Sequence, residues 1–161
     1  MYGLFWVTLF ILLMLAMLIL VPRRAVIKLF PVGIIGGFGQ AVIIMGFLVS
    51  VFEVWQLRYH DFFAFAGIPL FAALAWVPEV IMFSYFMKYL GNDRQVFAYL
   101  AGFTMLAGLS VHWLFRAGYL VYNGWNSILT LPVALLAHST IAYYIVKTSR
   151  VLDKRRQHSI E

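Results

Sequence analysis

Residues 3–21 read GLFWVTLFILLMLAMLILV, a run of 19 residues without a charged side chain. As a helix, such a run is about 29 Å long, close to the thickness of a bilayer's hydrocarbon core at about 30 Å. No positively charged segment precedes the run and no small-residue cleavage site ends it, and Pro22-Arg23-Arg24 follows at once. These features predict a membrane anchor rather than a cleaved signal peptide.

The composition of the whole chain extends this prediction. Its 161 residues are 64% hydrophobic and 11% charged, with a mean hydropathy of +0.92, whereas soluble domains are about 25% charged. We predict an all-α, polytopic helical membrane bundle in a single membrane domain, residues 1–161. The five expected transmembrane helices lie at about 3–21, 30–52, 62–90, 96–118 and 128–146, followed by a basic cytoplasmic tail over 147–161.

The third predicted helix is too long to cross a bilayer upright. Its 29 residues would measure about 44 Å, so it must tilt, bend or protrude. Pro69 and Pro78 are the expected bending points.

Lys and Arg predict the orientation of the bundle. An outside N-terminus and a cytoplasmic C-terminus place ten of the twelve basic residues on the cytoplasmic side, as the positive-inside tendency requires. Only Arg58 and Arg116 then lie outside. The ten inside residues are Arg23, Arg24, Lys28, Lys88, Arg94, Lys147, Arg150, Lys154, Arg155 and Arg156.

Three polar residues are expected near the middle of the membrane, namely Gln40, Glu79 and His138. A charge at that depth costs at least about 2.5 kcal/mol, so a chain that keeps one is a candidate for function there. We predict that the three side chains form a central polar cluster. Glu79 is expected either to be protonated because of burial or to be ionised against a protonated His138. A cluster that only joins helices by hydrogen bonds is the competing interpretation.

A second polar pair and a packing motif complete the pattern. His112 and Arg116 are predicted to form an outer-leaflet cluster facing Glu53 or Asp61, with Arg116 alternatively a simple interfacial anchor. Small residues on the second helix, together with a proline kink on the third, should permit close helix packing. These packing residues are Gly33, Gly36, Gly37 and Pro78.

Several kinds of chemistry have no motif in this sequence. It contains no cysteine, which excludes disulfides, thiolate catalysis and thiolate metal sites. It contains no HExxH, P-loop, GxGxxG or GxSxG pattern. We therefore predict no metal, no cofactor and no catalytic residues, and we attribute the net charge of +6 to membrane orientation rather than to nucleic-acid binding.

Four proline-containing segments carry a family resemblance: Leu20-Val-Pro-Arg-Arg24, Leu29-Phe-Pro-Val-Gly33, Gly67-Ile-Pro-Leu-Phe71 and Ala75-Trp-Val-Pro78. Over roughly the first two thirds of the chain, this pattern resembles small multi-pass membrane proteins of unknown function from spore-forming Gram-positive bacteria. The resemblance implies a bacterial plasma-membrane protein and transfers no functional residue.

Three hypotheses about function follow. The first is a non-enzymatic accessory or interaction subunit, with the lipid bilayer, anionic lipid at the basic tail, and a second copy or another membrane protein as its partners. The second is a small-solute or proton-coupled transporter using Glu79 and His138. The third is an intramembrane enzyme acting on a lipid or isoprenoid, with Glu79 as general acid.

Overall fold

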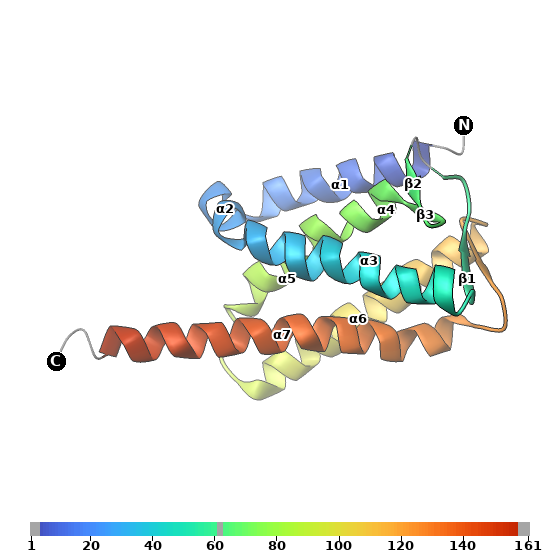
Figure 1. The fold of residues 1–161 in the computed structure, drawn as a ribbon. Coiled ribbons are helices and arrows are strands. Elements are labelled where there is room, and N and C mark those ends of the chain that lie inside the picture. The colour runs from blue at the N-terminus through green and yellow to red at the C-terminus, as the bar shows by residue number, and fades with distance from the viewer. Residues whose placement is uncertain (1–3, 61–62, 158–161) are drawn as a thin grey trace.

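The computed structural model describes residues 4–60 and 63–157, with side chains as far as Lys147. The chain is mostly helical, and its helices run along the bundle in five passes (Figure 1). The start of the first pass and the end of the last lie at opposite ends of the bundle. In order, the passes are α1 (Phe5–Leu20); α2 (Arg23–Val32) continuing through η2 (Gly33–Gly39), α3 (Gln40–Met45) and η3 (Gly46–Val51); α4 (Leu70–Leu74) with α5 (Trp76–Met87); α6 (Asp93–Arg116); and α7 (Ser127–Gln157).

Four helical stretches in the described part of the chain are long and apolar enough to cross a membrane. The first pass, α1, is shorter: its 16 residues measure about 24 Å. The prediction of a mostly helical bundle is therefore confirmed, with four candidate membrane-spanning stretches. The four stretches are Arg23–Val51, Leu70–Met87, Asp93–Arg116 and Ser127–Lys147.

The second pass begins seven residues before its predicted start at residue 30. The Pro22 carbonyl accepts hydrogen bonds from the amides of Ala25 and Val26, which opens a helix at Arg23. Proline at such a position has its φ already near the helical value and loses no internal hydrogen bond. The stretch predicted to be a basic loop thus forms the first turns of α2.

The third pass is shorter than predicted, because residues 63–69 form a hairpin and not a helix. Strand β2 (Ala64–Phe65) pairs antiparallel with β3 (Ile68–Pro69). The two connecting residues, Ala66 and Gly67, both have positive φ, as the tight turn of a two-residue hairpin requires. Pro69 precedes α4 as its N-cap and bends no helix.

Pro78 does mark a break in the third pass, as predicted. Helix α4 ends at Leu74 and α5 begins at Trp76. Pro78 lies in the first turn of α5 and has no N–H to donate to the Leu74 carbonyl. The carboxyl side chain of Glu79 therefore follows directly on a helix break.

One end of the bundle carries a second pair of short strands. Strand β1 (Trp55–Leu57) pairs antiparallel with β4 (Leu120–Tyr122), which joins the loop after the second pass to the loop after the fourth. The buried Trp6 indole donates to the Arg58 carbonyl at 3.2 Å. The strictly all-α prediction missed both pairs of strands: β1 and β4 lie between predicted helices, whereas β2 and β3 lie within the predicted third helix.

The last pass extends beyond its predicted end at residue 146. The α7 backbone is helical as far as Gln157, so the first part of the predicted tail continues the helix. The basic side chains of the tail after Lys147 lie outside the described residues, as does Asp61.

The third pass is the centre of the bundle, since 61% of the stretch Leu70–Met87, which contains α4 and α5, is buried. Val77, Ile81 and Tyr85 pack on one side with residues of α1 and α2. Val80, Phe83 and Met87 pack on another with residues of α6 and α7.

Glycines of η2 let the second pass approach α5 closely. A Cβ atom at Gly37 would lie 2.7 Å from the Trp76 carbonyl oxygen, and one at Gly33 would lie 2.7 Å from the Ile81 side chain. At Gly36 the nearest atoms, on Val80 and Ile141, would be at an ordinary 3.6 Å. The predicted packing role therefore applies to Gly33 and Gly37, whereas Gly36 faces α7 and α5 without crowding.

Replacing Gly37 by alanine should destabilise the bundle, because the new methyl group would meet backbone atoms that cannot rotate away. We expect Gly37→Ala to lower the free energy of unfolding by about 1–3 kcal/mol. Gly36→Ala is the matched control and should be neutral or stabilising by up to about 1 kcal/mol, since alanine favours helix more than glycine does. Unfolding of the purified protein in detergent measures both, and equal losses for the two variants would contradict this packing account.

Candidate functional site

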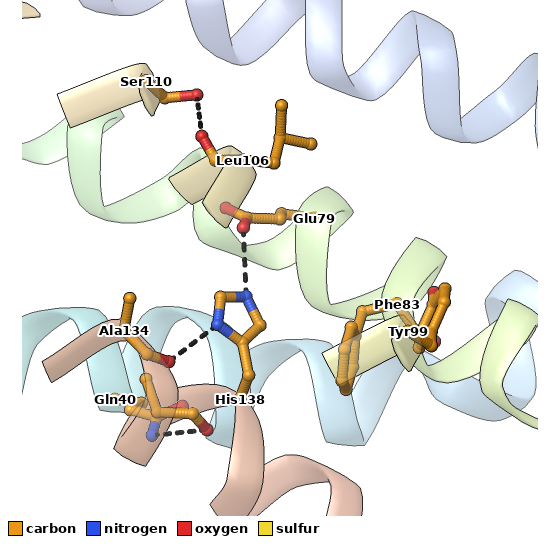
Figure 2. Close-up of polar contacts among 9 residues, drawn as sticks. Gln40, Glu79, Phe83, Tyr99, Leu106, Ser110, Ala134 and His138 are labelled. Carbon is orange, nitrogen blue, oxygen red and sulfur yellow. Dashed lines mark hydrogen bonds and ion pairs between the residues drawn. The ribbon is translucent and has the colours of Figure 1, made fainter. Parts of the chain in front are cut away.

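The structure brings Glu79 of α5 and His138 of α7 together (Figure 2). Glu79 Oε1 lies 3.6 Å from His138 Nε2. Glu79 is the tenth of the 18 residues in Leu70–Met87, and His138 is the twelfth of the 21 in Ser127–Lys147. Both side chains thus lie within about 2 Å of the middle of their helical stretches. This contact was predicted from the helix spacing, and it is the only ion pair among the described residues.

A hydrogen bond to the backbone fixes the orientation and tautomer of the His138 ring. His138 Nδ1 lies 2.8 Å from the Ala134 carbonyl oxygen. A carbonyl oxygen only accepts hydrogen bonds, so we assign the Nδ1 atom as protonated. In neutral His138 the remaining nitrogen, Nε2, is then an unprotonated acceptor that faces Glu79.

One proton between the two side chains satisfies both of them. If His138 is neutral, a protonated Glu79 offers an O–H to Nε2; if Glu79 is ionised, a protonated Nε2 offers the counter-charge. An ionised carboxylate facing an unprotonated Nε2 would place two acceptors against each other across the 3.6 Å contact, which is longer than a hydrogen bond. Both of the protonation states anticipated from the sequence contain a single proton and have no net charge.

Aromatic rings of α5 and α6 surround the imidazole. The centroids of Phe83 and Phe103 lie 5.3 and 5.8 Å from that of His138, within the range at which an aromatic face attracts a cation. Tyr99 stacks on Phe83 at 5.1 Å and donates from its hydroxyl to the Phe83 carbonyl. These rings tie α6 to α5 beside the pair and can stabilise an imidazolium at His138.

The two members of the pair differ in exposure. The side chain of His138 is 9% exposed, whereas that of Glu79 is 32% exposed. No donor among the described residues forms a hydrogen bond with either oxygen of Glu79. Figure 2 draws Leu106 and Ser110 of α6 near Glu79, and the Ser110 hydroxyl donates to the Leu106 carbonyl.

Gln40 lies beside the pair without contacting it. Its Nε2 donates to the Ala137 carbonyl at 3.2 Å, one residue before His138, and its buried Oε1 has no partner. Gly36, one turn earlier, faces Ile141, so Gly36 and Gln40 form the stripe of the second pass that contacts α7. The predicted central cluster is thus a Glu79–His138 pair, and Gln40 bonds to the residue before His138 rather than to the pair itself.

The predicted outer cluster has different partners from those expected. His112 Nδ1 lies 2.9 Å from the Ser127 hydroxyl, which is also 3.2 Å from the Tyr122 hydroxyl. Among the described residues, neither His112 nor Arg116 forms an ion pair with Glu53. The contact between His112 and Ser127 joins the end of α6 to the start of α7.

Three features of the site were not predicted from the sequence. They are the bond from Tyr99 to the Phe83 carbonyl and two buried hydroxyls without partners, those of Ser84 and Thr104. The hydroxyls are visible in the sequence as polar residues within apolar runs, but their isolation depends on the packing. Within the described part of the chain, no group of three or more His, Cys, Asp or Glu residues is arranged to hold a metal ion.

Comparisons with models of protein families, with curated proteins and with solved structures find no match to this chain.

Thermodynamic coupling between Glu79 and His138 should be measurable. Replacing one member alone leaves the other buried without its partner, which costs more than replacing both. We expect Glu79→Gln and His138→Gln to be non-additive by about 0.5–3 kcal/mol in unfolding free energy. Glu79→Gln combined with His112→Gln, which lies near the far end of α6, should be additive. Additivity in both cycles would show that the 3.6 Å contact carries no interaction.

Proposed function

We propose that the protein is a proton-coupled carrier of a small solute in the bacterial plasma membrane, with the Glu79–His138 pair as its proton-binding element. The observation that carries this proposal is the 3.6 Å approach of the Glu79 carboxyl group to Nε2 of His138, whose Nδ1 is bonded to the backbone, at the middle of two helices. Replacing a buried ionisable pair by apolar residues is often neutral or stabilising. A chain that retains such a pair at mid-membrane is therefore expected to use it.

The backbone around the pair supports this proposal. Glu79 follows Pro78, which leaves the Leu74 carbonyl without its helical hydrogen bond in the stretch Leu70–Met87, and a backbone group freed at that depth needs another partner. The second pass, which packs against Trp76 at Gly37, contains the π-helical stretch Gly33–Gly39. Stretches of π-helix occur frequently at functional sites.

An accessory or interaction subunit is the second candidate function, and the exposure of α6 favours it. Only 11% of the span of this helix is buried, the lowest share among the four long stretches. A second copy or another membrane protein would cover this face. In that case the Glu79–His138 pair would serve helix packing alone.

The proposal includes the topology predicted from the sequence: five membrane crossings, an outside N-terminus and a cytoplasmic C-terminus. Support comes from the five helical passes and from the start of α1 and the end of α7, which lie at opposite ends of the bundle. Lys88 lies 3.9 Å from the centroid of the Tyr85 ring, at the end that this topology places inside. Tyrosine and lysine are common at membrane interfaces.

The absence of cysteine permits a direct test of this topology. A Gln56→Cys variant, in β1, should react with a membrane-impermeant maleimide added to intact cells. An Asp93→Cys variant, at the start of α6, should react only after lysis, because the two positions lie on opposite sides of the membrane. The reverse labelling pattern would invert the orientation, and labelling of both positions in intact cells would rule out an odd number of crossings between them.

Carrier activity is tested with the protein reconstituted in liposomes that contain a pH-indicator dye. We expect a change in internal pH when a member of one solute class, among amino acids, sugars, metal cations and organic cations, is applied. Glu79→Gln should abolish this proton movement, because it removes the carboxylate that exchanges the proton, while Glu53→Gln in the connecting loop should leave it unchanged. Absence of Glu79-dependent proton movement for every class would overturn the carrier proposal in favour of the accessory subunit.

A further inference from the structure

The carboxylate of Glu79 has binding capacity that the protein itself does not use. A carboxylate has two oxygens and about four acceptor positions. In the described part of the chain, its one polar contact is the 3.6 Å approach of Oε1 to His138, which is longer than a hydrogen bond. Because Glu79 is the more exposed member of the pair, this unused capacity is open to a ligand from outside the bundle.

Within the described residues, no second cation lies against this carboxylate. The Lys and Arg residues of the chain lie near the ends of the helical passes or in the segments between them. A second copy would add only residues at the same depths, and its own His138 would already be buried against its own Glu79. A positive charge that reaches Glu79 must therefore come from a molecule other than this protein.

The surroundings of Glu79 define what kind of cation fits. The side chain of Leu106 on the neighbouring α6 is 57% exposed, while the rings of Phe83 and Phe103 pack against His138. The position is at the middle of the span, where water does not solvate a small ion. A metal cation would need several oxygen ligands, whereas a hydrophobic organic cation needs one counter-charge and apolar contacts.

We infer that Glu79 binds a hydrophobic organic monocation in exchange for the proton that it shares with His138. This inference rests on the proposed carrier function and names its substrate class. In the exchange, the cation pairs with the Glu79 carboxylate, His138 remains neutral with its proton on Nδ1, and one proton leaves. The charge of the site is then the same before and after, so neither state leaves an unpaired charge in the membrane.

The groups that can take part in this proton exchange are few. From α7, His138 faces Glu79; the residues of α6 drawn near it in Figure 2, Leu106 and Ser110, do not titrate. Tyr99, also on α6, is bonded to the Phe83 carbonyl. From α3, Gln40 carries no ionisable group. The proton released on cation binding therefore comes from the Glu79–His138 pair.

Tetraphenylphosphonium is the probe for this site, and tetraphenylborate, its anionic isostere, is the matched control ligand. The full chain in detergent, in weak buffer, is titrated with each ligand while heat and a pH-indicator dye are recorded. We expect saturable binding of tetraphenylphosphonium alone, with one proton released per cation bound. Glu79→Gln should weaken binding about tenfold or more, which corresponds to the loss of one ionic contact, whereas Glu53→Gln should leave it unchanged.

A second variant keeps the test decisive if Glu79→Gln does not fold. Glu79→Asp preserves the charge on a shorter side chain, so it should retain proton release and bind more weakly. Equal binding of both ligands, binding that is insensitive to Glu79, or binding without proton release would overturn the inference. If the cation does not bind but another solute gives Glu79-dependent proton movement in the liposomes, the substrate class is wrong and the carrier function stands. Binding with proton release but without any proton movement across the liposome membrane would retain the site and reject the carrier.

Discussion

The close approach of Gly37 to the Trp76 carbonyl is the contact on which the arrangement of the bundle depends. In lipid, helices gain little from the hydrophobic effect, so tight van der Waals packing of small residues holds them together. This contact brings the second pass against the break between α4 and α5, and it turns the neighbouring stripe, Gly36 and Gln40, toward α7. Because α5 is then enclosed on two sides, the Glu79 side chain can extend only toward α7 and toward the outside of the bundle.

The sequence predicts the helical passes well where apolar runs end at charged or turn-forming residues, and poorly where they do not. Residues 63–69 are as apolar as a membrane helix, and only the turn at Ala66 and Gly67 with two positive φ angles makes them a hairpin. Hydropathy alone does not separate these two structures. The early start of α2 at Arg23 was missed for the opposite reason, since basic residues that indicate a loop are also good helix formers.

The central pair was predictable because helix periodicity and depth are local properties of the sequence. Glu79 and His138 each lie near the middle of a long apolar run, so two packed helices bring them to the same level. The partners of His112 were not predictable by this reasoning, because Ser127 and Tyr122 reach it through the loop that pairs β4 with β1. Contacts that depend on such non-local pairing require the structure.

The pair is asymmetric, and this asymmetry determines how it can respond to a ligand. His138 is held by the Ala134 carbonyl, by two aromatic rings and by burial. Glu79 is held by a single long contact, and its side chain is the more exposed of the two. Any change in protonation or occupancy at this site should therefore move the carboxylate and leave the imidazole in place. Since Glu79 follows directly on Pro78, such a movement acts at the turn where the third pass lacks one helical hydrogen bond.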